Sequence, residues 1–234
     1  MVCDSYINDY SCLASNFLMV KRPDIELPED RYEEYSIPGR DGKQYVKTKY
    51  REDIQISIPY NFMVNEENWF EEKRKAQKFF GNAKTLSFKD NFNYYYKVKK
   101  VILGKVVRTS KRIGNIVVTF ILDPYEYLKS GETFNENVGT YLNQYSETHP
   151  NYKIIGEGVC TLTVNGNEIE CNVGQSLIIN TDLQESYKLN DSGTVERMNT
   201  SISGEYEKMY FNEGINVVSI TDGFTLLVQP NWRY

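Results

Sequence analysis

The chain has 234 residues and a mass of 27.3 kDa, with a formal net charge of −5 and a sequence pI of about 5.2. Hydrophobic residues make up 40% of it and charged residues 25%, which is the balance of an ordinary globular protein. A mildly acidic chain lacks the general attraction for phosphate backbones that nucleic-acid-binding proteins show, so that class is disfavoured.

The first residues contain no signal for secretion. No positively charged segment precedes an apolar run, and Asp4 and Asp9 interrupt the sequence early. Nowhere does the chain approach the roughly 18 consecutive apolar residues that a membrane span needs. We therefore expect a protein without a signal peptide that folds in the cytosol where it is made.

Four cysteines, Cys3, Cys12, Cys160 and Cys171, are scattered along the chain. None belongs to a CxxC pair, which argues against a zinc ribbon or a thioredoxin-like site. A reducing compartment also disfavours disulfides.

Apolar runs in the first half predict β-strands. Residues 54–58 alternate isoleucine with polar residues, which indicates a half-buried strand that ends at Pro59. Two longer runs, 96–107 and 113–122, are joined by a basic turn. Within the second of them, residues 116–122 are apolar on both faces apart from one threonine, which is typical of a central strand.

Residues 66–80 have the pattern of a single α-helix. Asn65 is a suitable N-cap, acidic residues follow it, basic residues come later, and Gly81 closes the segment. This order of charges complements the helix dipole. The residues expected to share the side that packs on a sheet are Trp69, Lys73, Ala76 and Phe80, with Phe70 and Phe79 as further aromatic contacts.

The composition changes at residues 129–150, which are polar and rich in turn formers. We therefore predict a domain over 1–128 and a second domain over 129–234, whose first strand could lie around Thr133 to Val138. Because the predicted elements of the first domain are strands around one helix, its expected fold is a β-sandwich or split barrel.

The second half contains a strong hairpin signal. Asn165-Gly166 is the favoured two-residue type I′ turn, and pairing the residues outward from it sets the register of both strands. One face then carries Cys160, Leu162, Val164, Ile169 and Cys171, and the other carries Thr161, Thr163, Glu168 and Glu170. This alternation is what one buried face requires.

The same register places Cys160 opposite Cys171. The Cα atoms of such a hydrogen-bonded pair lie roughly 5.5 Å apart, which would permit a disulfide. Because the compartment is reducing, we predict two buried free thiols instead.

Three shorter runs, 176–180, 215–220 and 224–228, complete the second half, with a turn at 221–223 between the last two. Short strands separated by frequent turns predict a β-sandwich. The whole chain is therefore predicted to be mainly β.

No arrangement of residues predicts catalysis. The single histidine, His149, precedes a proline, and no serine or cysteine nucleophile is marked for it. One histidine and scattered cysteines make a metal site improbable, and no phosphate-binding glycine motif is present. We expect no enzyme, no cofactor, and no catalytic, cofactor-binding or metal-ligating residue.

Charged and aromatic clusters leave alternatives open. An acidic run and a carboxylate pair could supply acid–base chemistry, but a solvated loop and turn chemistry explain them more simply. Two basic clusters and an aromatic one could bind nucleic acid or sugars, although solvated strand faces, a hairpin tip and core or interface packing are the simpler interpretations. These clusters are Glu26/Glu29/Asp30/Glu33/Glu34, Asp123/Glu126, Lys97/Lys99/Lys100, Arg108/Lys111/Arg112 and Phe92/Tyr94/Tyr95/Tyr96.

Several turn motifs follow one another in a family-like order. The first is the double turn from Ile37 to Gly42, IPGRDG, and a strand-ending Asp123-Pro-Tyr follows much later. The others are Asn137-Val-Gly-Thr, the segment 150–158, the Asn165-Gly166 hairpin, and Gly214-x-Asn216 before a final hairpin that ends near Arg233. In their order and spacing the chain resembles the distal tail (Dit) proteins of long-tailed phages, or siphoviruses, over nearly its whole length.

The resemblance implies a structural protein of a phage or prophage, located at the virion tail tip and made in the bacterial cytoplasm. Six copies would form a ring hub, a homo-hexamer that joins the tail tube protein to the tail-associated tip protein. DNA would pass through its lumen without specific binding. The first domain would form this ring. The second, a galectin-like sandwich, would hold baseplate or receptor-binding proteins used in host adsorption.

A second interpretation is a carbohydrate-binding module or adhesin that recognises glycans on the host cell surface. Aromatic-rich β-sandwiches often bind sugars through exposed rings. The residues that could form such a platform are Tyr206, Tyr210, Phe211 and Trp232.

Overall fold

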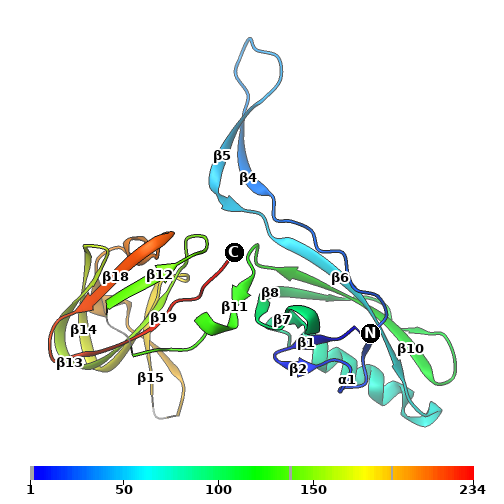
Figure 1. Ribbon diagram of the computed structural model, residues 1–234. Coiled ribbons are helices and arrows are strands. Elements are labelled where there is room, and N and C mark those ends of the chain that lie inside the picture. Colours follow the sequence, from blue (N-terminus) through cyan, green and yellow to red (C-terminus); the bar gives the residue numbers. More distant parts are fainter. Residues whose placement is uncertain (1–2, 137–138, 191) are drawn as a thin grey trace. The chain divides into compact units, whose positions relative to one another are not determined.

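The computed structural model describes residues 3–136, 139–190 and 192–234. The chain forms two compact units, which divide between Glu126 and Tyr127, and both are mainly antiparallel β-structure (Figure 1). The mainly β fold class predicted from the sequence is therefore confirmed. Within the described ranges, no helix has both the length and the apolar character that crossing a membrane would require.

The first unit is built on one large antiparallel sheet with the strand order β2-β1-β7-β8-β10-β6-β3, and β9 pairs with β10. The strands are β1 (Ser5–Ile7), β2 (Tyr10–Ser11), β3 (Leu18–Met19), β6 (Ile54–Met63), β7 (Thr85–Phe88), β8 (Tyr94–Leu103), β9 (Val107–Arg108) and β10 (Ile113–Leu122). A separate hairpin, β4 (Asp30–Tyr35) and β5 (Gln44–Arg51), forms a two-stranded sheet of its own.

The predicted strand at 54–58 is confirmed, but it does not end at Pro59. β6 continues to Met63 and pairs with β10 along its whole length. The carbonyl of Pro59 accepts a hydrogen bond from the Val20 amide (2.9 Å), so this residue turns its polar groups away from β10. Because N–H and C=O of one strand residue point the same way, the missing proline N–H removes no bond from the β6–β10 ladder.

The predicted central strand is also confirmed, because β10 lies between β6 and β8. Its burial differs from the prediction. Ile116, Val118 and Phe120 are buried, whereas the alternate Val117 is 48% exposed. The apolar run therefore covers the core with one face and leaves apolar side chains on the other.

The predicted helix is confirmed as α1 (Trp69–Gly81), preceded by a 3₁₀ turn over Glu66–Asn68. The predicted capping differs, because Asn65 makes no side-chain hydrogen bond to the helix start. Lys73 is exposed, and Glu72 is buried in its place, where it accepts a hydrogen bond from Asn16 Nδ2 (2.9 Å). The buried face is Trp69, Glu72, Ala76 and Phe80, the i, i+3, i+7 and i+11 spacing of one helical stripe.

The second unit contains a sheet with the order β12-β18-β13-β14-β15-β16, in which β17 pairs with β14 and β19 with β13. Its strands are β11 (Tyr127–Leu128), β12 (Gly139–Asn143), β13 (Asn151–Val164), β14 (Asn167–Asn180), β15 (Glu185–Leu189), β16 (Val195–Arg197), β17 (Ile202–Ser203), β18 (Gly214–Ile220) and β19 (Thr225–Gln229).

The hairpin predicted around Asn165-Gly166 is confirmed in turn, register and face. Both turn residues have positive φ, 53° and 81°, as a type I′ turn requires. The pairing runs outward through Cys160 opposite Cys171, and the five residues of the predicted inner face are buried. One dipeptide thus sets the register of two 14-residue strands.

Two strand predictions in this half are corrected. Residues 176–180 are the end of β14 and not a separate strand, because the pairing with β13 continues without a register shift through Gln175, despite its positive φ of 69°. The segment from Thr133 contributes only a single bridge, Asn135 to Val228, and the first full strand after it is β12. Residues 137 and 138 of that prediction lie outside the described residues.

Cys160 and Cys171 lie opposite each other in the predicted register and are both buried, and no bond joins them in the structure. Burial raises the pKa of the Cys171 thiol to about 12, and it does the same for Cys12 in the first unit. Only Cys3 is exposed among the four.

We predict that a thiol-specific chromogenic reagent modifies one of the four thiols, Cys3, in the native protein at neutral pH. The buried thiols are protonated and inaccessible, so they should react only after denaturation. Absorbance titration with and without denaturant, with Cys3→Ser as the control, measures this. Rapid modification of a second thiol in the native state would contradict it.

Candidate functional site

The hairpin β4–β5 is the feature of the first unit most exposed to solvent. Its tip contains the sequence-predicted double turn, in which the Arg40 amide donates to the Ile37 carbonyl (3.2 Å). Gly39 and Gly42 both have positive φ, 79° and 78°, which side chains other than glycine rarely adopt. The tight turn reverses the chain at the tip. β4 and β5 pair only with each other and form a two-stranded sheet.

No residue from 31 to 51 is buried. The hairpin nevertheless carries four tyrosines, Tyr32, Tyr35, Tyr45 and Tyr50, each between 48% and 59% exposed. An isolated two-stranded hairpin is marginally stable in water, because it has no core of its own. Exposed tyrosines at this density are typical of surfaces that a protein partner covers.

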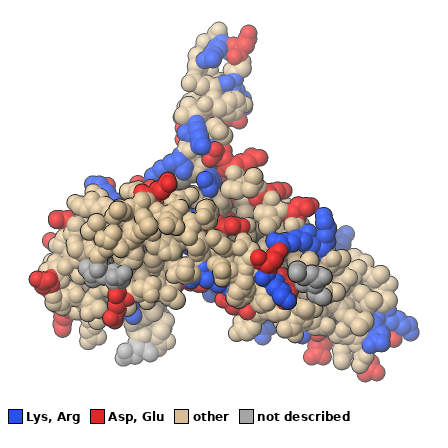
Figure 2. All heavy atoms as spheres, viewed as in Figure 1, with Lys and Arg blue, Asp and Glu red and all other residues tan. Residues whose placement is uncertain are grey.

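Charges of both signs lie along the hairpin (Figure 2): β4 carries three carboxylates and Arg31, whereas every charged residue of β5 is basic. Across the pair, Lys43 bonds Glu34, and Lys47 bonds Asp30. Arg31 Nε lies 3.5 Å from Glu52 Oε1. The solvated-loop interpretation of the acidic run is correct for Glu26 and Glu29 but not for the other three residues, which lie on strand β4; none of the five is buried.

The two carboxylates that bracket Pro124 are not an acid–base pair. Asp123 lies 2.9 Å from Lys99 Nζ, which also contacts Asp53 at 2.6 Å, whereas Glu126 accepts a hydrogen bond from Tyr96. Each carboxylate is engaged by a different partner.

The basic clusters are also partly neutralised. Lys99 is held by the two aspartates just described, and Glu66 lies 3.8 Å from Arg108 and 3.5 Å from Lys111 at the hairpin tip. Arg112 bonds the side chain of Asn65. Of the aromatic cluster, Tyr95 and Tyr96 are buried and Phe92 is 46% exposed, so the cluster packs mainly into the unit.

His149 belongs to a structural network in the second unit. Its Nδ1 lies 2.8 Å from Asp182 Oδ1, and its Nε2 lies 3.0 Å from Arg233 Nη2. A neutral ring that donates from Nδ1 and accepts at Nε2 satisfies both contacts. The ring stacks on Tyr210 with centroids 3.9 Å apart. With Arg233 only 5% exposed, this network anchors the C-terminal segment.

The aromatic platform considered for sugar binding is not formed. Phe211 is fully buried, and it packs against Trp232 with ring centroids 5.9 Å apart. Tyr210 has its face covered by His149. The sequence identified the aromatic residues but not the direction in which they point.

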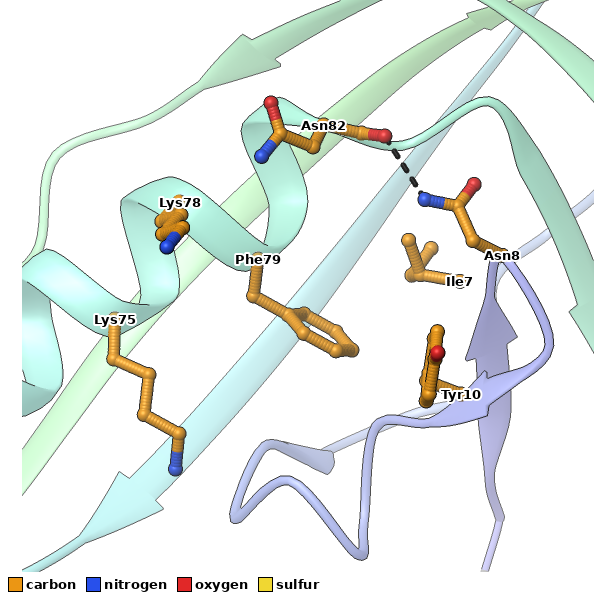
Figure 3. A pocket seen from close by; sticks show the side chains of 7 residues that line it. All are labelled: Ile7, Asn8, Tyr10, Lys75, Lys78, Phe79 and Asn82. Atoms are coloured by element: carbon orange, nitrogen blue, oxygen red, sulfur yellow. Dashed lines mark hydrogen bonds between the residues drawn. The ribbon is translucent and has the colours of Figure 1, made fainter. Parts of the chain in front are cut away.

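A surface hollow of about 290 Å³, missed by the sequence analysis, lies in the first unit beside α1 (Figure 3). It is lined by Ile7, Asn8, Tyr10, Lys75, Lys78, Phe79 and Asn82. Its lining combines apolar side chains with lysines. The sequence feature that could have indicated this hollow is the run of basic residues in the second half of the helix. Throughout the described ranges, no group of three or more His, Cys, Asp or Glu residues could hold a metal ion.

Comparison with known proteins yields a match of fold alone. No protein-family model matches the chain, and no curated protein sequence matches it. Among solved structures, the crystal structure of the Dit protein of phage SPP1 matches with a TM-score of 0.63 and 12% sequence identity. The match covers 97% of this chain and 98% of that one, and that protein is described as a paradigm of the hub adsorption apparatus in phages that infect Gram-positive bacteria.

We predict that replacing residues 30–51 by a short glycine–serine linker leaves the first unit folded. The flanking residues are already neighbours, because the Glu52 amide bonds the Glu29 carbonyl at 2.8 Å. Since the removed residues lie outside the core, the free energy of unfolding should change by less than about 1 kcal/mol. Ile56→Ala, in the core, should cost about 2–5 kcal/mol in the same urea titration. An unfolded deletion variant would contradict the prediction.

We also predict that His149→Phe weakens the second unit. The new ring preserves the stacking on Tyr210 but leaves the nearly buried Arg233 guanidinium without its ring acceptor, at a cost of about 1–3 kcal/mol. Urea unfolding followed by fluorescence in a Trp69→Phe background, where Trp232 is the single tryptophan, measures the loss. Glu213→Lys, a change at an exposed position in the same unit, is the control. Equal stability of His149→Phe and the native chain would refute this role.

Proposed function

We propose that this protein is the distal tail subunit of a phage or prophage, a structural hub at the virion tail tip. The observation that carries the proposal is the fold match to the Dit protein of SPP1, which extends over nearly the full length of both chains. A shared single domain would support little, because common folds serve many functions. A match that covers 97% of this chain extends over both of its units and is a more specific likeness.

In this proposal six copies assemble into a ring. A closed head-to-tail ring requires each subunit to present two different patches that fit each other. An obligate interface of this kind buries roughly 2,000 Å² or more, much of it aromatic. The tyrosine-bearing hairpin β4–β5 supplies an exposed surface of suitable composition.

The two units have separate roles in the proposal. The first unit, corresponding to the predicted domain 1–128, forms the ring and contacts the tail tube protein and the tail-associated tip protein. The galectin-like second unit, corresponding to 129–234, holds baseplate or receptor-binding proteins. DNA passes through the lumen without specific binding, in keeping with the acidic total of the chain. Assembly takes place in the bacterial cytoplasm.

We predict that the purified protein has a solution mass near six times 27.3 kDa by light scattering, because each subunit in the proposed ring engages two neighbours. Negative-stain electron microscopy should then show rings with six-fold symmetry. A monomer at every concentration, together with binding of the native chain on a glycan array, would instead favour the carbohydrate-binding function.

A further inference from the structure

The hollow beside α1 has an apolar floor and a defined shape. Figure 3 shows the Phe79 ring pointing from the helix toward Ile7 at the end of β1 and Tyr10 at the start of β2. Tyr10 is 70% exposed, although it lies against an apolar neighbour. One end is fixed by the Asn8 side chain, which donates to the Asn82 carbonyl at 2.9 Å. The hollow is thus preformed and large enough for one or two aliphatic side chains.

The hollow lies in a strongly basic part of the surface. From residue 73 to residue 84 the chain carries five basic residues and no acidic one. The Lys75 ammonium is already engaged, with Ser15 O at 3.2 Å and Glu72 Oε1 at 3.3 Å. Lys78, on the rim, is exposed, and no described carboxylate forms an ion pair with it. The rim therefore offers an unpaired positive charge beside an apolar floor.

The complementary chemistry occurs elsewhere in the same unit, in residues 24–29, DIELPE. These residues belong to no helix or strand, and Leu27 is 85% exposed, the highest value among the exposed large apolar residues of the described chain. The carboxylates of Glu26 and Glu29 form no ion pair within the described chain, unlike those of Asp30 and Glu34 on β4. Ile25 of the same segment is also exposed (38%), so the segment offers two apolar side chains beside unpaired carboxylates, which complements an apolar hollow with a positive rim.

The segment 24–29 does not fill the hollow of its own chain. It is tethered at its start by the Val20 amide to the Pro59 carbonyl and at its end by the Glu52 amide to the Glu29 carbonyl. Arg22, just before the segment, pairs with Asp90 and lies over the Phe88 ring of β7, and no residue from 24 to 29 lines the hollow. A second copy of the chain is the occupant that brings this segment to the hollow.

We propose that the hollow beside α1 receives Leu27 and its flanking glutamates from a second copy of this chain. The contact is head-to-tail, because hollow and segment are different patches of opposite charge, which is the geometry a closed ring requires. The inference rests on the proposed function and adds to it the two surfaces through which neighbouring subunits meet.

The decisive experiment uses two charge reversals in the full chain, Lys78→Glu and Glu26→Lys. Each variant alone places like charges at the contact, so we expect self-association at least tenfold weaker than that of the native chain. An equimolar mixture should regain native association. In alternating rings, the altered hollow then meets the altered segment, and the two unaltered patches meet each other. Light scattering and sedimentation over a concentration series measure the assembly.

Two further variants control for folding and for general charge effects. Glu213→Lys changes the charge of the second unit by the same amount and should assemble like the native chain. Leu27→Ser removes the apolar side chain without altering charge, and we expect it to weaken association at least tenfold as well. Leu27 and Lys78 are both exposed. The melting temperatures of Leu27→Ser and Lys78→Glu should therefore equal that of the native chain.

The outcomes separate this inference from the proposed function. If the native chain forms a ring and both charge reversals form it equally well, the inference is wrong and the hub function stands. If both reversals dissociate the ring but their mixture does not restore it, the direct pairing is wrong. If the native chain remains monomeric at every concentration, the inference and the proposed ring fall together.

Discussion

The ladder between β6 and β10 is the constraint on which the first unit depends. Ten consecutive residue pairs hold the two strands in one register, so every second side chain of each strand enters the same core. The helix α1 covers that core with Trp69, Ala76 and Phe80, and Phe80 lies 4.7 Å from the Tyr60 ring of β6. The hairpin β4–β5 leads directly into β6, so the ladder also determines where this hairpin leaves the first unit.

The second unit depends on a two-residue turn that determines the pairing of two long strands. Two residues with positive φ at Asn165-Gly166 align β13 with β14, and β18 and β19 then pair with β13. The network of His149, Asp182 and Arg233, in which Arg233 is buried, adds a polar anchor for the end of the chain. Each unit thus has its own core and its own source of register, which suits a protein whose two parts would serve different partners.

The distribution of ion pairs separates structural charge from surface available to a partner. On β4, Glu34 pairs with Lys43 and Asp30 pairs with Lys47, and Lys99 is held between two aspartates. Lys78 and Glu26 form no such pairs in the described chain. With 12% identity to the SPP1 protein, the fold is shared while the surface chemistry is free to differ. Subunit contacts are therefore best sought in this chain's own unpaired charges.

Local patterns in the sequence were sufficient for the mainly β class, the helix, the central strand, the type I′ hairpin with its face, and the double turn at Ile37–Gly42, because periodicity and turn chemistry act over a few residues. Strand pairing across the chain decided the rest. Because of it, β6 continues past Pro59. In the folded chain, Glu72 and not Lys73 lies on the buried face of the helix, and Phe211, expected in an exposed platform, is buried. The hollow beside α1 joins residues about 70 positions apart, and only the tertiary structure brings such residues together.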